Sequence, residues 1–174
     1  MPARILGGCL AAAILLASAP VVAQQPALPN LDEVPEAMPF NVPYGLAIGA
    51  DKAREVVAAA VAESKKRNWA MVIAVVDGAG NLVSFERMEG AQLASIEIGQ
   101  HKARAAARFR RETKIFEANI NRGLAYLTTL DGVIGSRGGI PLVEGGKLIG
   151  AIGVSGGTGS QDEVIAKAGA ALVK

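Results

Sequence analysis

The fold is decided by residues 138–157, which read GGIPLVEGGKLIGAIGVSGG. Two short apolar segments flank residues 144–147, and the Gly-Gly pair at the centre accepts the positive φ angles of a two-residue hairpin turn. Glycines at 150 and 153 indicate that the second strand passes close to another backbone or bends there. These residues predict a β-hairpin near the end of the chain.

A helix is predicted after this hairpin. The glycine-rich residues 156–159 break the strand, and Ser160 and Glu163 then have the spacing of a capping box. Apolar residues follow at helical spacing, namely Val164, Ile165, Ala168 and Leu172. The sequence therefore predicts a capped C-terminal helix, and this arrangement alone indicates no chemistry.

The first 23 residues have the pattern of a secretory signal peptide. Arg4 gives a positive start, residues 5–17 form an apolar run too short to span a bilayer comfortably, and residues 21–23 offer small side chains before Gln24. We expect cleavage after Ala23, a periplasmic or secreted protein, and no membrane span afterwards. An uncleaved anchor and a lipoprotein site at Cys9 are weaker alternatives.

Cleavage would remove Cys9, which is the only cysteine of the chain. The mature protein would then have no disulfide, thiolate ligand or thiol nucleophile. The charge is nearly balanced, with 18 basic and 16 acidic residues in 174. Such a balance predicts no strong general attraction to nucleic acid, and the length suits one globular domain.

Residues 24–46 are predicted to form a proline-rich extended arm before a single domain at residues 47–174. Prolines recur at short intervals and prevent a continuous helix or a central strand. Glu33 and Glu36 have the E-x-x-E spacing that can bind iron, but on an irregular arm we interpret them as solvated side chains.

The domain begins with a predicted helix over residues 51–67, capped by Asp51 and carrying an apolar stripe. Residues 70–76 are apolar without alternation, which is typical of a strand covered on both faces. A turn at residues 77–81 and a second strand at 82–88 follow. A hairpin so soon after a helix favours an antiparallel sheet, since parallel neighbours need a long crossover.

Acidic residues of this hairpin could carry chemistry. Glu86 and Glu89 form a second E-x-x-E, but residues three apart on a strand point to opposite faces, so a surface pair is the simpler interpretation. Asp77 opens a glycine-rich turn, where an aspartate usually serves the turn itself.

The helix predicted over residues 93–111 is the second informative stretch. Leu93, Ile96, Gln100, Ala103 and Ala107 mark its expected inward stripe, and its other side carries His101, Arg104, Arg108 and Arg111. His101 is the only histidine, which excludes a three-histidine metal site. A histidine beside several arginines suits an anionic, planar or metal-bearing ligand. The alternative is a solvated basic helix, and nucleic acid is disfavoured because Phe109 is the only aromatic residue of the patch.

Three segments together resemble the GlcG/HbpS family, whose module also occurs in some corrinoid adenosyltransferases. They are residues 75–91, with VVDGAGNLV and RMEGA, residues 102–106, with KARAA, and residues 138–169, with GGIP, GAIGVSG and QDEVIAKAG. The resemblance covers residues 48–173. It implies an α+β fold similar to profilin and PAS-like domains, with a central antiparallel sheet flanked by helices, which agrees with the element order predicted above. It also implies homo-oligomers, and haem binding in several members.

The resemblance does not identify the residue that meets the iron, because members differ in this ligand. His101 and Thr113 are the two candidates beside the basic helix, with Met88 behind them. Haem propionates would pair with Lys102, Arg104 or Arg108. Glu86 and Glu89 are weaker candidates for iron, since their spacing is similar to a motif of exported members.

We therefore expect an exported, non-enzymatic haem-binding protein that serves haem or iron handling or sensing. One alternative is an enzyme or accessory protein of small hydroxy- or keto-acid catabolism, with Asp77, His101 and Arg104 as acid–base groups and carboxylate clamp. Another is an oligomeric partner of a sensor or transport protein.

Overall fold

The structure is a computed structural model, and it describes residues 30, 32–38 and 40–174. The predicted signal segment lies outside these residues, as does the start of the predicted arm. No helix of the described part of the chain is long and apolar enough to cross a membrane.

The described chain forms four α-helices, one 3₁₀-helix and four strands. In chain order these are α1 (Ala50–Arg67), β1 (Val72–Asp77), β2 (Leu82–Arg87), α2 (Ser95–Arg108), α3 (Lys114–Asn121), η1 (Ala125–Thr129), β3 (Gly139–Glu144), β4 (Lys147–Ser155) and α4 (Gly159–Ala170). The strands form one antiparallel sheet in the order β2-β1-β4-β3. This confirms the predicted α+β fold with a central antiparallel sheet.

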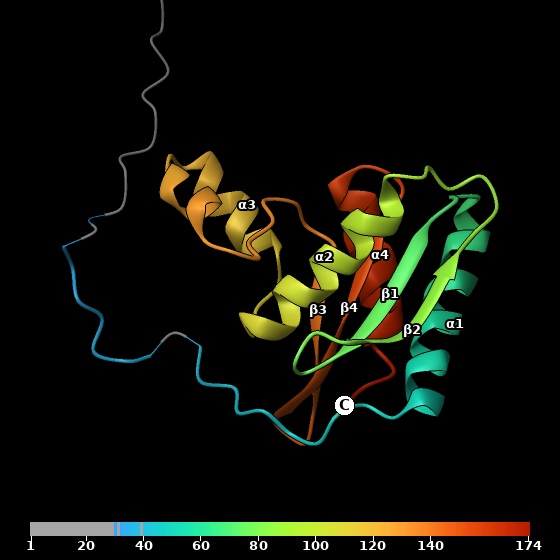
Figure 1. The fold of residues 1–174 in the computed structure, drawn as a ribbon, viewed down its shortest axis with the longest axis horizontal. Helices are drawn as coiled ribbons and strands as arrows, with labels where there is room; N and C mark the ends of the chain where they lie inside the picture. Colours follow the sequence, from blue (N-terminus) through green and yellow to red (C-terminus); the bar gives the residue numbers. More distant parts are fainter. Residues whose placement is uncertain (1–29, 31, 39) are drawn as a thin grey trace, which may run out of the picture.

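The sheet separates two apolar layers, and its strand β1 contributes to both. Ile73 and Val75 join the larger cluster beneath α1 and α4. Ala74 and Val76 point the other way, into a cluster rich in alanine beneath α2. All side chains from Val72 to Val76 are buried, as the apolar run without alternation predicted. Figure 1 shows α2 crossing one face of the sheet, with α4 behind it.

The β3–β4 hairpin has the predicted turn. Gly145 and Gly146 have φ angles of 54° and 74°, which a residue with a β-carbon rarely adopts. Along β4, a β-carbon added to Gly153 would collide with backbone atoms of Gly99 and Ala103 in α2. The prediction that β4 passes close to another backbone is therefore confirmed, and that backbone is α2.

Two predicted helix caps are wrong by a few residues. The N-cap of α1 is Gly49, and Asp51 lies in the first turn, where it pairs with Arg54. The capping box of α4 consists of Thr158 and Gln161, whose side chains each accept a hydrogen bond from the other's backbone N–H. Because the α4 helix begins at Gly159, the predicted cap Ser160 already lies inside it.

The buried faces of α4 and α2 also differ from the predicted apolar stripes. Val164 on α4 and Leu172 just beyond its end are exposed, whereas Asp162 and Glu163 are buried. On α2, Leu93 precedes the helix and is 71% exposed. Ala103 and Ala107 of the predicted stripe are buried as expected. The other buried positions of α2 near the sheet are small residues and one lysine, namely Ser95, Gly99, Lys102 and Ala106.

The end of the arm is docked on the sheet. The Leu148 N–H donates to the Pro43 carbonyl, and the Gly45 and Ile48 N–H groups donate to the carbonyls of Leu148 and Ile149, each at 2.8 Å. β1 ends opposite Gly150, so the arm takes its place beside the first residues of β4.

Candidate functional site

The outer face of α2 lines a cavity of about 330 Å³. Its walls are Glu97, Ile98, His101, Arg104, Arg108 and Gly132. Most of these residues fall three or four positions apart on α2, so they share the side opposite the sheet. The small inner residues of α2 hold this face in position by packing directly on β4 and β1.

The cavity holds two guanidinium groups that no carboxylate neutralises within the described structure. Arg104 donates to the Gln100 side-chain oxygen at 2.9 Å, and Arg108 donates through Nε to the Ala79 carbonyl at 2.9 Å. Each guanidinium keeps further N–H donors for a ligand. The cavity therefore combines an imidazole, two cations, the carboxylate of Glu97 and the apolar side chain of Ile98. Helical spacing predicted that His101, Arg104 and Arg108 share this side. The same prediction was wrong for Arg111, because α2 ends at Arg108 and Arg111 lies over the Phe40 ring instead.

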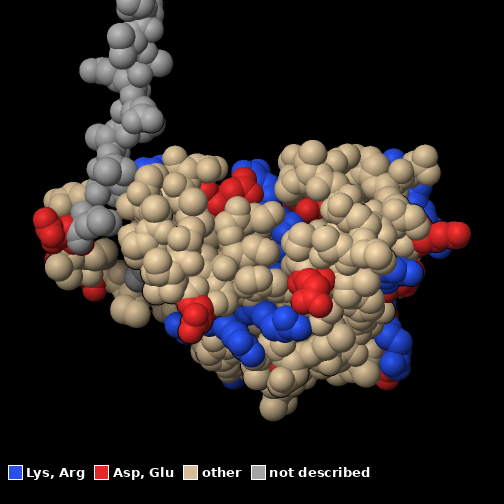
Figure 2. All heavy atoms as spheres, turned by 45° about the horizontal axis from the view of Figure 1, so that its top comes forward, with Lys and Arg blue, Asp and Glu red and all other residues tan. Residues whose placement is uncertain are grey.

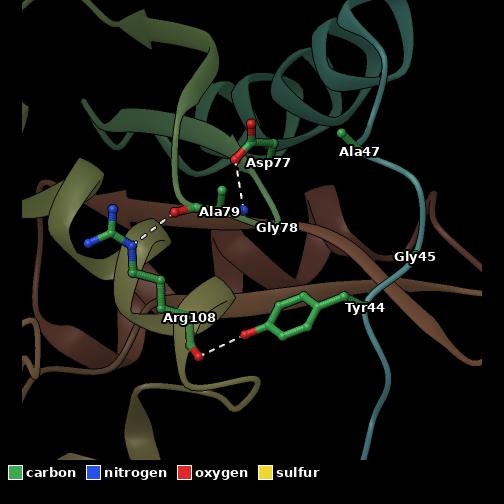
Figure 3. A pocket seen from close by; sticks show the side chains of 7 residues that line it. All are labelled: Tyr44, Gly45, Ala47, Asp77, Gly78, Ala79 and Arg108. Carbon is green, nitrogen blue, oxygen red and sulfur yellow. Dashed lines mark hydrogen bonds between the residues drawn. The ribbon is translucent and has the colours of Figure 1, made fainter.

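A second cavity, of about 470 Å³, adjoins the first. Figure 3 shows its lining residues, which come from the arm, the β1–β2 turn and the end of α2: Tyr44, Gly45, Ala47, Asp77, Gly78, Ala79 and Arg108. Arg108 lines both cavities, so its position links the arm to the outer face of α2.

Asp77 serves the turn that it opens. Its carboxylate accepts hydrogen bonds from the N–H groups of Ala79 and Asn81 at 2.9 Å and from the Asn81 side chain at 3.0 Å. Burial acts to raise the pKa of Asp77, but the hydrogen bonds outweigh it and hold the pKa below its usual value. A carboxylate that stays ionised and accepts three hydrogen bonds is poorly suited to proton transfer. Asp77 also lines a different cavity from His101.

Lys102 is not available to a ligand at the surface. It is 1% exposed, and its ammonium donates to the Asp162 carboxylate at 2.7 Å. Asp162 also accepts from the Gly157 N–H at 3.0 Å. Burial raises the pKa of Asp162, and these hydrogen bonds oppose that rise. The expected pairing of Lys102 with a propionate does not agree with this placement, because its position on α2 faces the sheet.

Thr113 is completely buried at the start of α3. Its hydroxyl accepts the Gly139 N–H at 2.9 Å, and its own N–H donates to the Gly139 carbonyl at 3.0 Å. These bonds tie the α2–α3 junction to the edge strand β3. A hydroxyl held in this way does not reach the cavity of His101.

The remaining predicted site residues lie away from this cavity. Met88 packs against the apolar cluster beneath α1, on the opposite face of the sheet from α2. Glu86 and Glu89 are exposed at and beyond the end of β2. The described residues contain no group of three or more His, Cys, Asp or Glu side chains that could hold a metal ion.

Two residues at or behind the site were missed by the sequence interpretation. Tyr44 was placed in an irregular arm, although Phe40, Val42 and Tyr44 alternate with period two, as a docked extended segment does. Asp162 lies between the two residues of the predicted capping box, and no local pattern indicates that it is the partner of a lysine 60 positions earlier.

The molecular surface shows no broad area of one charge on the face drawn in Figure 2. Lys and Arg side chains are interspersed there with Asp and Glu, and uncharged residues cover most of the remainder. This distribution agrees with the nearly balanced charge of the sequence.

Comparison with known proteins identifies relatives over most of this domain. Residues 48–171 match the model of a family described as haem degrading protein HbpS-like. Protein GlcG of Escherichia coli is 43% identical over 103 residues, which is 59% of this chain and 77% of GlcG.

Solved structures of two relatives share the fold. A crystal structure of HbpS superimposes with a TM-score of 0.70 and 28% identity, covering 77% of this chain and 95% of HbpS. A crystal structure of a PduOC–heme complex gives a TM-score of 0.68 and 27% identity, covering 74% of this chain and 96% of PduOC.

Proposed function

This chain belongs to the HbpS-like family, and we propose that it binds haem in the cavity on the outer face of α2. The observation that carries the proposal is the meeting of His101, Arg104 and Arg108 around one cavity. The haem complex of the relative PduOC supports the choice of ligand. The sequence pattern of residues 1–23 supports export, so we propose a role in haem or iron handling outside the cytoplasm.

The donor set of the cavity fits haem. Haem supplies an iron centre that an imidazole nitrogen can ligate and two propionates that arginine can pair. His101 is the only imidazole of the chain and is partly exposed on α2. Arg104 and Arg108 lie on the same helix face with unpaired N–H donors, and Ile98 adds an apolar wall.

Each residue then has one role. The imidazole of His101 presents a nitrogen toward the cavity, Arg104 and Arg108 orient the ligand through its carboxylates, and Ile98 excludes water from one side. Lys102 and Thr113 support the site from behind, since the former fixes α2 to α4 and the latter fixes the α2–α3 junction to β3.

Titration of purified protein with hemin, followed by absorbance, tests the proposal. We expect a sharpened and shifted Soret band that saturates at about one haem per chain. A titration that follows the spectrum of free hemin throughout would refute haem binding.

The role of the arginines is tested by Arg104→Gln. Loss of one charge-assisted hydrogen bond near the surface should weaken hemin binding by about fivefold to tenfold. Binding of the dimethyl ester of hemin, which lacks the carboxylates, should change little. Arg54→Gln is the matched control, because Arg54 is exposed on α1, across the sheet from α2. Equal effects of the two substitutions would remove Arg104 from the site.

The structure gives less support to an enzyme acting on a small acid. That alternative requires Asp77, His101 and Arg104 to converge, but Asp77 lines the neighbouring cavity and its carboxylate is bonded within its own turn. Glu86 and Glu89 remain a second candidate site for iron, distinct from the haem cavity.

A further inference from the structure

Arg108 is held from two sides by segments that are remote in sequence. Its guanidinium Nε donates to the Ala79 carbonyl in the β1–β2 turn at 2.9 Å. Its own carbonyl accepts the hydroxyl of Tyr44, from the arm, at 2.9 Å. Figure 3 shows the tyrosine ring lying across the second cavity toward the end of α2.

The bond from Tyr44 closes the C-terminal end of α2. Arg108 is the last residue of that helix, and the last carbonyls of a helix have no partner within it. The hydroxyl of Tyr44 gives the Arg108 carbonyl a hydrogen-bond donor, and it also lies 3.5 Å from the Ala107 carbonyl. The helix that presents His101, Arg104 and Arg108 is thus capped by the arm.

Two further arginines, which follow α2 in the chain, contact the same arm. Arg110 donates to the Val42 carbonyl at 3.1 Å and lies over the Tyr44 ring, 5.5 Å from its centroid. Arg111 lies over the Phe40 ring at 3.1 Å. Burial, and then the charge of Arg110, lowers the pKa of Arg111. The rings of Phe40 and Tyr44 and the backbone carbonyl of Val42 between them therefore all contact arginines that follow α2.

The backbone at this junction has a strained residue, and that residue contacts the arm. Arg110 has a φ angle of 53°, which is uncommon for a residue other than glycine, asparagine or aspartate. Strain of this kind persists only where the surrounding structure holds it in place. Here the left-handed residue directs one guanidinium onto the arm as the chain leaves α2.

We propose that residues 40–44 form a latch that positions Arg108 for an acidic group of the bound ligand, with Tyr44 as the positioning residue. The identity of that ligand as haem rests on the proposed function. The latch acts through Arg108, because this residue lines both the cavity of the arm and the cavity of His101. Tyr44 itself does not line the cavity of His101.

The test compares Tyr44→Phe with Tyr126→Phe, which removes the hydroxyl of the only other tyrosine. Tyr126 is 52% exposed on η1, and its hydroxyl has no hydrogen bond within the described structure. Tyr44→Phe should weaken hemin binding about threefold to tenfold. The control should bind as the unmodified protein does, and binding of hemin dimethyl ester should be unaffected in both.

A double-mutant cycle separates positioning from a general structural effect. If Tyr44 acts through Arg108, the Tyr44→Phe substitution should have no further effect on hemin affinity in an Arg108→Gln background. An equal loss in both backgrounds, or no loss in the single variant, overturns the latch while leaving haem binding established.

A second measurement does not depend on haem. The Nε–H signal of Arg108 in a proton–nitrogen NMR spectrum should be protected from exchange in the unmodified protein and lose that protection in Tyr44→Phe. Unchanged protection overturns the latch whether or not hemin binds. Lost protection in a protein that does not bind hemin refutes the proposed function alone and retains the latch for another acidic ligand.

Discussion

Lys102 and Asp162 form an ion pair inside the protein, with side chains 1% and 3% exposed. Removing charges from water is costly, so such a pair contributes to stability only when its geometry and its additional hydrogen bonds are good. Here Asp162 has a second donor in the Gly157 N–H, and the pair joins α2 to the start of α4. Its role is to fix the helix that carries the site.

We predict that Lys102→Met destabilises the protein by about 3–5 kcal/mol, because it leaves a buried carboxylate without its cation. Adding Asp162→Asn should restore at least half of the lost stability, since the amide oxygen can still accept a hydrogen bond from the Gly157 N–H. Urea unfolding of both variants measures these changes. A double variant no more stable than the single one would show that the charge pair is not the cause.

At the scale of residues, the sequence predicted the exposed side of α2 better than its buried side. Helical spacing alone brings His101, Arg104 and Arg108 together, and the structure confirms that they share a cavity. Lys102 lies beside them in the sequence but points inward. The partner that makes this burial possible comes from α4, and local spacing carries no information about it.

The packing of α2 on β4 depends on glycine. A β-carbon at Gly153 would meet backbone atoms of Gly99 and Ala103, which cannot move aside as the end of a flexible side chain could. This close approach brings α2 into contact with β1, β4 and β3, and it leaves the outer face of the helix for a ligand.

Gly153→Ala should therefore destabilise the protein by about 3 kcal/mol or more through overpacking. Gly49→Ala is the control, because a β-carbon at Gly49 meets nothing within 4 Å and the loss of an N-cap glycine costs at most about 1 kcal/mol. Thermal unfolding measures the stability of the two variants. Equal losses of stability would contradict the close approach of β4 to α2.

At the scale of elements, the glycine turn and the unbroken apolar run of a strand predicted the structure better than the apolar stripes of helices did. The Gly145–Gly146 turn and the buried strand β1 were predicted correctly, because the first needs positive φ angles and the second needs cover on both faces. The stripe on α4 was correct for Ile165, which is buried, but it missed Asp162 and Glu163, which ion pairs make tolerable on the buried face. Apolar periodicity cannot reveal a charged residue that is buried with a partner.

For the whole molecule, the site depends on parts that are far apart in the chain. The sheet holds α2 from below, α4 anchors it through Asp162, and the arm caps its end through Tyr44. The extended arm over residues 24–46 stays a prediction. The docking of its end depends on backbone groups of β4 left open where β1 ends, which the sequence does not show. Homo-oligomerisation stays a prediction.

The central claim is that haem binds at the outer face of α2 through His101, and the spectrum of the hemin complex of His101→Ala tests it most directly. We predict a displaced, weaker Soret band, and its return toward the original position when free imidazole is added to fill the vacated ligand position. A His101→Ala complex with the same spectrum and affinity as the unmodified protein would contradict the claim and place the iron elsewhere.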